Sequence, residues 1–323
     1  MKLIIFPFVG QKAEESARTA ENFGGSVLRV RPEDLPTIHD AEFDAAFTNA
    51  VNKFVHAPEL CSTFLFCPVA SVHIFMREFL KIADLPIKLL GSSPIQQEMN
   101  AHRTLMSQVR MLQPLAKVPE IELAGILKRA MSIYGESSEI KIAAMVGVFD
   151  DAPKAGHVVE IGSLAGRTAS VLGYMSERSG IHSLFTIDPW SPAMGVQADS
   201  PATLIDMTNE WNWEMLAEMY SVNTFDLRST SHVRGSSDHV HLHEDFVISV
   251  LHIDGNHDYA CVRVDCDKYA SRILPGGWLI LDDYEWAHGD GPKRAGDELL
   301  AERAHEIEKH FVCGNALFVK FKL

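Results

Sequence analysis

The residues best suited to chemistry form two acidic clusters. Asp254 and His257 follow one short apolar run, and Asp282 and Asp283 follow another. Apolar runs of this length, bounded by turn residues, predict buried strands of a parallel sheet, and ligands bind just beyond the carboxyl ends of such strands. Carboxylate oxygens there suit Mg²⁺ or a similar divalent cation, whereas a histidine suits proton removal near neutral pH.

A glycine-bearing loop precedes these clusters in the chain. Glu160 ends a predicted strand, and Gly162 and Gly166 let the backbone turn tightly and let a ligand approach closely. The helix predicted to start near Arg167 offers free N–H groups to a polar ligand. The pattern E-x-G-x-x-x-G is neither the dinucleotide fingerprint nor a Walker A loop. Asp188 ends the next predicted strand, where an acid commonly accepts hydrogen bonds from ribose hydroxyls.

Taken in this order, the loop, Asp188, the Asp254 strand and the turn at 274–277 resemble class I S-adenosylmethionine-dependent methyltransferases. Within that superfamily, the stretch 253–259 together with 282–284 is similar to the metal-dependent sugar O-methyltransferases of macrolide and aminocoumarin tailoring. The resemblance covers residues 157–323. It implies a magnesium-dependent O-methyltransferase that acts on a hydroxyl of a sugar, a glycan or another hydroxylated small molecule.

The resemblance also assigns roles to particular residues. It implies that Asp254, Asp282 and Asp283 hold Mg²⁺ or another divalent cation, and that His257 is the base. Some relatives carry Glu where this chain has Asp282. The implied contacts with S-adenosylmethionine fall on one set of residues: Glu160, Gly162, Ser163, Gly166, Thr168, Asp188, Trp190 and Ser236.

Other interpretations of the same residues stay open. A metal-dependent hydrolase, hydroxylase or oxygenase could use the same acids, with His252 as the second histidine of an iron site, and this superfamily branch also includes proteins described as cephalosporin hydroxylases. A third interpretation is a non-catalytic binding module whose cofactor-binding fold has lost its function, which the intact motif residues disfavour. Asp254 and Asp282 could cap helices, and Trp190 could belong to the core.

The predicted elements organise the chain into three parts. Residues 1–95 are predicted to form a small α/β domain. Its expected role is that of an accessory or oligomerisation domain, with substrate recognition as the alternative. Residues 96–150 read as a helical connector. Residues 151–323 read as a Rossmann-like, mainly parallel doubly wound sheet with an antiparallel last strand. The segment 189–225 is expected to form a helical lid over the site.

The predicted boundaries of the elements follow from hydrophobic periodicity and turn residues. Strands are expected at 2–8, 26–30, 63–66, 87–90, 157–161, 183–187, 230–233, 247–253, 277–281 and 316–321. Helices are expected at 11–23, 72–83, 96–112 and 120–134. The alternating His239, His241 and His243 read as part of a strand, and their spacing gives little support to a zinc site.

The composition limits the classes of partner. The 323 residues are 46% hydrophobic and 22% charged, which is ordinary for a globular protein with a core. A net charge of −14 disfavours a nucleic acid partner, and no apolar stretch approaches the length of a membrane span. The five cysteines form no C-x-x-C pair, so reduced thiols in the cytoplasm are the simplest interpretation. We also expect a homo-oligomer.

Overall fold

The computed structural model describes residues 2–36, 42–55, 63–82, 87–90, 94–197 and 201–323. It divides into two compact units, Met1–Thr104 and Leu105–Leu323, and each is described by itself. Helix α4 (Pro94–Ala116) contains the boundary between the two units. Cys61 lies outside the described residues.

The N-terminal unit is a small parallel sheet with helices on both faces. Its strands are arranged in the order β2-β1-β3-β4 and span Lys2–Ile5 (β1), Ser26–Arg29 (β2), Thr63–Phe66 (β3) and Ile87–Leu89 (β4). Its other elements are α1 (Gly10–Asn22), the short 3₁₀ turn Pro32–Asp34, α2 (Phe43–Val55) and α3 (Ala70–Ile82). Small alanines of α1 pack on one face of β1, whereas aromatic side chains of α2 and α3 pack on the other. The alternation of strand and helix that the sequence predicts here is therefore confirmed.

The C-terminal unit is built on a seven-stranded sheet in the order β10-β11-β9-β8-β5-β6-β7. The strands are β5 (His157–Ile161), β6 (Leu184–Asp188), β7 (Thr230–Arg234), β8 (Ile248–Ile253), β9 (Ile273–Leu281), β10 (Ile307–Cys313) and β11 (Ala316–Phe321). Strands β5 to β9 pair in parallel, and β11 is antiparallel to β9. This is the Rossmann-like sheet with an antiparallel last strand that the sequence predicts. The chain order reverses between β5 and β8, so their carboxyl ends form the crevice in which such sheets bind ligands.

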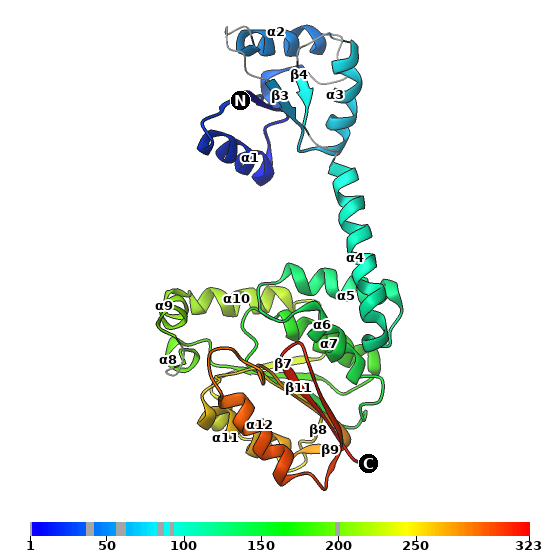
Figure 1. Cartoon of the computed structure of the whole chain (residues 1–323), viewed down its shortest axis with the longest axis vertical. Helices are drawn as coiled ribbons and strands as arrows, with labels where there is room; N and C mark the ends of the chain where they lie inside the picture. The colour runs from blue at the N-terminus through cyan, green and yellow to red at the C-terminus, as the bar shows by residue number, and fades with distance from the viewer. Residues whose placement is uncertain (1, 37–41, 56–62, 83–86, 91–93, 198–200) are drawn as a thin grey trace. The chain divides into compact units, whose positions relative to one another are not determined.

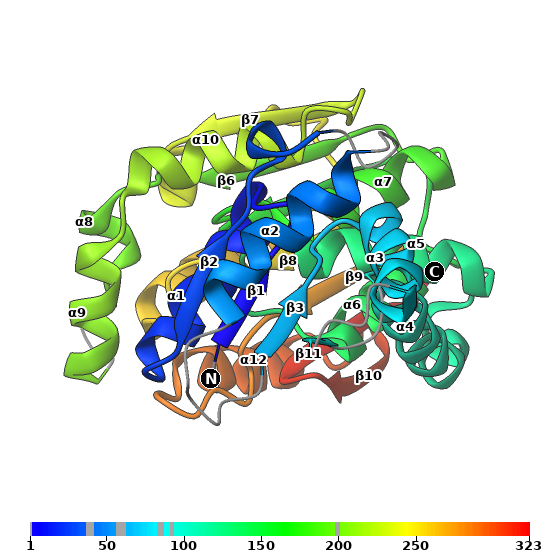
Figure 2. The same cartoon turned by 90° about the horizontal axis from the view of Figure 1, so that it is seen from above.

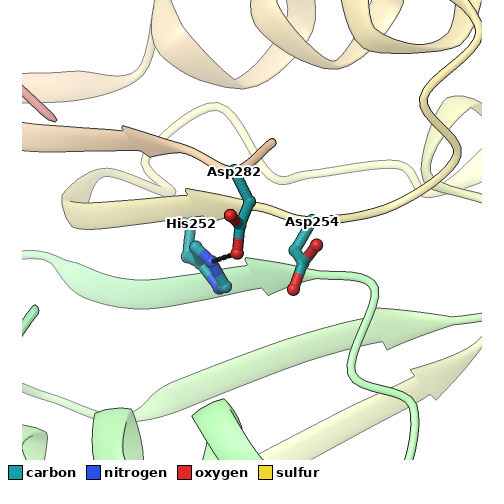
Figure 3. A group of neighbouring side chains, drawn as sticks. All are labelled: His252, Asp254 and Asp282. Carbon is teal, nitrogen blue, oxygen red and sulfur yellow. Dashed lines mark hydrogen bonds and ion pairs between the residues drawn. The ribbon is translucent and has the colours of Figure 1, made fainter. Parts of the chain in front are cut away.

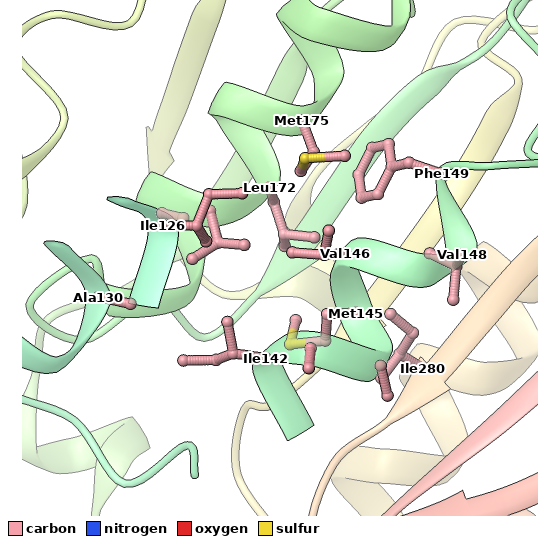
Figure 4. Packing of buried hydrophobic residues seen from close by; sticks show 14 of the residues in the cluster. Ile126, Ala130, Ile142, Met145, Val146, Val148, Phe149, Leu172, Met175 and Ile280 are labelled. Carbon is pink, nitrogen blue, oxygen red and sulfur yellow. The ribbon is translucent and has the colours of Figure 1, made fainter. Parts of the chain in front are cut away.

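Helices cover both faces of this sheet. Figure 1 shows α11 (Tyr259–Ala270) and α12 (Gly291–Glu302) below it, and α5 (Glu120–Ser132), α6 (Glu139–Val148) and α7 (Arg167–Ser179) above it. The upper core is apolar and closely packed, with Val146, Leu172, Met175 and Ile280 among the contacting side chains (Figure 4). This core packs α6 and α7 against β5, β8 and β9.

The segment after β6 forms three helices near the rim of the crevice. They are α8 (Pro192–Gly195), α9 (Ala202–Glu210) and α10 (Trp213–Asn223). Both views place α8 and α9 beyond one end of α10, at the edge of this unit (Figures 1 and 2). The predicted helical insertion is therefore present, and its motion as a lid stays a prediction.

Two local predictions were wrong or incomplete. The histidines 239, 241 and 243 lie in an exposed loop that begins with the 3₁₀ turn Ser237–His239 and are not part of a strand, because none of the described strands pairs with them. Strand β10 was not predicted, because it is a largely exposed edge strand without an apolar face. Among the described residues, no helix combines the length and the apolar character needed to cross a membrane.

Candidate active site

A cavity of about 560 Å³ lies at the carboxyl ends of the central strands. The loops after β5, β6, β7, β8 and β9 all contribute to its lining, together with α6 and the helices of the 189–225 segment. Its position is the one expected for a ligand site at the reversal of strand order. The walls combine backbone loops, acidic groups and aromatic rings.

The glycine loop after β5 requires its glycines. Gly162 has a φ of +81°, and a Cβ there would lie 2.0 Å from the carbonyl oxygen of Asp254, so no larger residue fits. Gly166, with a φ of +89°, is the N-cap of α7. The backbone N–H groups of Ser163 and Leu164 both donate to Oδ2 of Asp188, at 2.8 and 3.0 Å. Asp188 therefore holds the loop as well as facing the cavity.

The predicted cofactor residues divide into two groups. Five of them line the cavity: Gly162, Ser163, Thr168, Asp188 and Ser236. The other three, Glu160, Gly166 and Trp190, are absent from its lining. Trp190 is 3% exposed, packs against Tyr220, and donates from Nε1 to the carbonyl of Leu164. Direct packing of Trp190 on the cofactor is therefore not what the structure shows; the indole is a core residue that braces the loop, since the φ of +42° at Trp190 turns it inward.

Two acids and a histidine face the cavity together. Asp254 follows β8, Asp283 follows β9, and both line the cavity with His257. The Nε2 atom of His257 lies 3.3 Å from Oδ2 of Asp283 and 3.8 Å from Oδ1 of Asp254. The ring of Trp286 packs edge-on against that of His257. Within the described residues, the buried Nδ1 of His257 has no hydrogen-bond partner.

Asp282 has a different environment from its two predicted companions. It is 1% exposed and does not line the cavity. Its Oδ1 lies 2.5 Å from Nζ of Lys141, on α6, and its Oδ2 lies 3.4 Å from Nε2 of His252. Figure 3 shows the carboxylate of Asp282 turned toward His252, with Asp254 beside it. The structure therefore does not gather Asp254, Asp282 and Asp283 into one ligand set: Asp254 groups with Asp282 and His252, or with Asp283 and His257.

The buried network continues across the sheet to the glycine loop. Nδ1 of His252 lies 3.2 Å from Oε1 of Glu160, its neighbour in the register of β5 and β8. The other carboxylate oxygen of Glu160 accepts a hydrogen bond from Oγ of Ser163 at 2.8 Å. Because carboxylates only accept when ionised, a ring with a carboxylate at each nitrogen is held as the imidazolium. Glu160 thus supports the glycine loop from the buried side, through Ser163.

Burial and charge shift the pKa values of this cluster in opposite directions. Burial and the charge of Asp282 raise the pKa of Asp254 to about 7. Burial disfavours the charged form of His252, but the carboxylates of Asp282 and Glu160 outweigh it and raise the pKa of His252 to about 10. Burial likewise opposes ionisation of Asp282, and His252 and Lys141 outweigh it, so the pKa of Asp282 falls below its usual range. Asp282 is therefore an ionised acid whose charge is compensated by His252 and Lys141, whereas the carboxyl of Asp254 is partly protonated at neutral pH.

The donor set at the cavity fits a divalent cation. Asp254 and Asp283 offer hard oxygen ligands, and His257 lies beside both of them. No lysine or arginine pairs with either acid at salt-bridge distance in the described parts of the chain, whereas Lys141 already pairs with Asp282. His252, the second histidine that an iron site would use, groups with Asp254 and Asp282, but both of its nitrogens face carboxylates and its side chain is fully buried.

Sequence reasoning missed the role of Lys141. It is 5% exposed and is the single charged residue among the buried side chains of α6. One lysine within an otherwise apolar helical run was a usable signal, since buried lysines are nearly always paired. The partner could not be inferred, because Asp282 lies 141 positions away.

Aromatic rings form much of the remaining wall. Trp211 and Trp213 come from the 189–225 segment, Tyr134 follows α5, and Trp286 follows β9. Trp211 lies edge-on to Tyr134 and tilted against Trp213. These rings offer broad apolar surface with polar edges, which suits the faces of sugar or aromatic rings.

Residues 159–284 match a family model described as a methyltransferase domain. The matched region runs from β5 to the acids after β9, and so contains the glycine loop, Asp188 and the Asp254–His257 cluster. The C-terminal unit therefore contains a region similar to methyltransferase domains, on the Rossmann-like fold that the resemblance in its sequence implied. None of the curated proteins matches this chain.

Several solved structures are similar to the chain at low identity. The O-methyltransferase NovP is 18% identical, with a TM-score of 0.46 over 58% of this chain and 84% of NovP. CalS11, a TDP-rhamnose 3'-O-methyltransferase in calicheamicin biosynthesis, is 14% identical, with a TM-score of 0.41 over 72% of this chain and 96% of CalS11. The SAH-bound Podospora anserina methyltransferase PaMTH1 is 14% identical, with a TM-score of 0.41 over 72% of this chain and all (100%) of PaMTH1. The similarity to methyltransferase domains rests on the family match and not on these likenesses.

Proposed function

We propose that this protein transfers the methyl group of S-adenosylmethionine to a hydroxyl of a sugar or another hydroxylated small molecule, with the help of a divalent cation. One observation carries the proposal: the glycine loop and Asp188 line the same cavity as Asp254, Asp283 and His257. A donor site and an acidic, histidine-bearing site therefore open onto one space.

The cofactor would lie against Gly162, Ser163 and Asp188, with Ser236 further along the cavity. When bound, S-adenosylmethionine supplies an electrophilic methyl group. Gly162 lets the backbone of Asp254 pack directly against the loop, and Asp188 holds the loop by accepting hydrogen bonds from the N–H groups of Ser163 and Leu164. A pre-organised loop favours binding, because less conformational entropy is lost.

The cation would be held by Asp254 and Asp283, with Asp282 fixing the turn that carries Asp283. The main-chain N–H of Asp283 donates to Oδ1 of Asp282 at 2.7 Å, which supports this positioning role. When bound, the cation supplies Lewis-acid activation of substrate oxygens, which lowers the pKa of a hydroxyl. Within the described residues, no lysine or arginine lies at salt-bridge distance from these two acids, so their charges are suited to hold a cation.

His257 would take the proton of the reacting hydroxyl at Nε2. That atom faces the two acids at the cavity wall, and Trp286 packs against the ring and restricts its motion. General-base assistance of this kind contributes about 10²–10⁴ in rate. The aromatic wall of Trp211 and Trp213 would orient the ring of the substrate so that its hydroxyl points at His257.

The experiment follows transfer of a radiolabelled methyl group from S-adenosylmethionine to a panel of glycosides and phenols with neighbouring hydroxyls. We expect transfer with Mg²⁺, loss in EDTA and recovery when Mg²⁺ is restored. Asp283→Asn should abolish the response to Mg²⁺, and His257→Ala should lower turnover by about 10²–10⁴. Asp245→Asn, on an exposed loop, serves as the control. A rate of methyl transfer that stays unchanged both in EDTA and in Asp283→Asn would contradict the role of the cation.

A further inference from the structure

Lys141 brings a positive charge to the inner side of the acid cluster. It lies on α6, lines the cavity, and is almost fully buried. The proposed mechanism gives this ammonium no task. Burying a charged group is costly unless the charge is paired, and within the described parts of the chain Nζ of Lys141 has one hydrogen-bond acceptor, Oδ1 of Asp282.

The carboxylate of Asp282 is fully occupied by donors of the protein. Its Oδ1 accepts hydrogen bonds from Nζ of Lys141 at 2.5 Å and from the main-chain N–H of Asp283 at 2.7 Å. Its Oδ2 faces Nε2 of His252 at 3.4 Å, on the side that Figure 3 shows. A metal ion would have to displace one of these donors before it could bind to Asp282.

The root of the lysine side chain is confined by its surroundings. The main-chain N–H of Lys141 donates to Oγ of Ser138, the N-cap of α6, at 3.4 Å. Gly314 lies in the turn between β10 and β11, and a Cβ there would lie 2.7 Å from Cβ of Lys141 and 3.0 Å from Oγ of Ser138. The backbone of this turn therefore closes over the lysine and keeps its side chain directed at Asp282.

The ammonium also acts on the two acids that would hold the cation. Burial opposes the charge of Lys141, but the carboxylates of Asp282, Asp254 and Asp283 outweigh burial and raise its pKa, so the group is an ammonium at neutral pH. A divalent ion attracted by the same acids is repelled by this ammonium, and the repulsion is stronger in the interior than in water because the effective dielectric constant is lower.

We propose that Lys141 acts as an internal competitor of the divalent cation: it withholds Asp282 from the ion and lowers the affinity of the site for such ions. The inference rests on the cation site of the proposed function. Mg²⁺ that is bound through one or two carboxylates keeps several water ligands. Restricting the ion to Asp254 and Asp283 therefore leaves positions that the oxygens of the acceptor can take.

Binding of Mn²⁺ to the full chain, measured by the electron paramagnetic resonance signal of the free ion, tests this. Lys141→Met should bind Mn²⁺ about tenfold or more tightly than the natural protein, because Asp282 is released and the repulsion is gone. Lys141→Arg, which keeps the charge, should keep the natural affinity. Lys117→Met is the matched control, since Lys117 forms a half-exposed pair with Asp150, and it should also leave the affinity unchanged.

A double variant keeps the test decisive if Lys141→Met does not fold. Lys141→Met combined with Asp282→Asn removes both charges of the buried pair, so no uncompensated partner of that pair stays in the interior. The inference predicts that this variant binds Mn²⁺ as tightly as the natural protein does. A role of Asp282 as a ligand of the ion predicts instead a loss of about tenfold or more in affinity.

The outcomes separate this inference from the proposed function. Unchanged or weaker binding of Mn²⁺ by folded Lys141→Met would overturn the role of Lys141 and leave the cation site of the natural protein standing. Tighter binding by Lys141→Met and by Lys141→Arg alike would also count against it, since the charge would then not matter. Binding of Mn²⁺ by none of these proteins would overturn the cation site together with the inference. The response of methyl transfer to EDTA judges the proposed function separately.

Discussion

At the scale of single residues, the pairing of Lys141 with Asp282 gives Asp282 a structural role, whereas the other two acids face the cavity. Both side chains are almost fully buried, at 6% and 1% exposure. Removing one partner of a buried pair leaves an uncompensated charge in the interior. The pair is therefore expected to matter for stability more than surface ion pairs do.

We predict that Lys141→Met lowers the free energy of unfolding by about 3–5 kcal/mol. The matched control is Lys117→Met, because Lys117 pairs with Asp150 at 2.9 Å with both side chains about half exposed. That change should cost no more than about 1 kcal/mol. Urea unfolding followed by circular dichroism measures both. Similar losses in the two variants would show that Asp282 does not depend on Lys141.

The sequence predicts the cavity acids but not the direction of every side chain. Asp254 and Asp283 were recognisable because each follows an apolar run that ends at the ligand-binding edge. Trp190 follows Asp188 in the same way, yet its indole turns into the core, since its direction depends on a positive φ that no pattern reveals. Lys141 was missed because its partner is distant in the chain.

At the scale of elements, the turn between β5 and α7 is the most tightly constrained part of the site. Gly162 combines a positive φ with backbone atoms where a side chain would be. Gly180, at the end of α7, has a positive φ of +68° but open space around it. A substitution at Gly180 therefore tests backbone strain alone, whereas a substitution at Gly162 tests backbone strain and steric exclusion together.

We predict that Gly180→Ala costs about 1–2 kcal/mol, the strain of a left-handed residue with a side chain. Gly162→Ala should cost more and should also weaken binding of S-adenosylhomocysteine, because the loop must move away from Asp254. Thermal unfolding and calorimetric titration measure the two effects. An equal loss of stability in both variants, with cofactor affinity kept in Gly162→Ala, would be the contrary result.

The central strands were predictable from the sequence, whereas the edge strand β10 was not. Strand β8 is buried along its whole length, so hydrophobicity alone identifies it. Strand β10 is largely exposed, and its pairing with β11 decides its structure. The loop through His239 shows the converse, since its alternating histidines find no strand to pair with. Tertiary pairing, which a single sequence does not show, outweighs local pattern at these positions.

At the scale of the whole molecule, the chain carries two separate cores. Aromatic residues such as Phe43 and Phe47 build the first, and the helices packed on the seven-stranded sheet build the second. The site residues named here all belong to the second unit. Cooperative unfolding follows cores, so each unit is expected to unfold by itself.

Differential scanning calorimetry should therefore show two transitions, and S-adenosylhomocysteine should raise the temperature of only one. A ligand stabilises the unit that binds it in proportion to RT ln(1 + [L]/Kd), which is about 2.7 kcal/mol at a hundredfold excess over Kd. A single transition that shifts as a whole would mean that the two units unfold together.

In the proposed mechanism the cofactor methyl group and the cation meet beside Asp254, Asp283 and His257. The most direct measurement is the NMR relaxation of ¹³C-methyl S-adenosylmethionine bound to the protein as Mn²⁺ is added. We predict strong paramagnetic broadening of the methyl signal, which Asp254→Asn removes while the compound stays bound. A bound methyl group that Mn²⁺ leaves unbroadened, or broadening that persists in Asp254→Asn, would contradict the account.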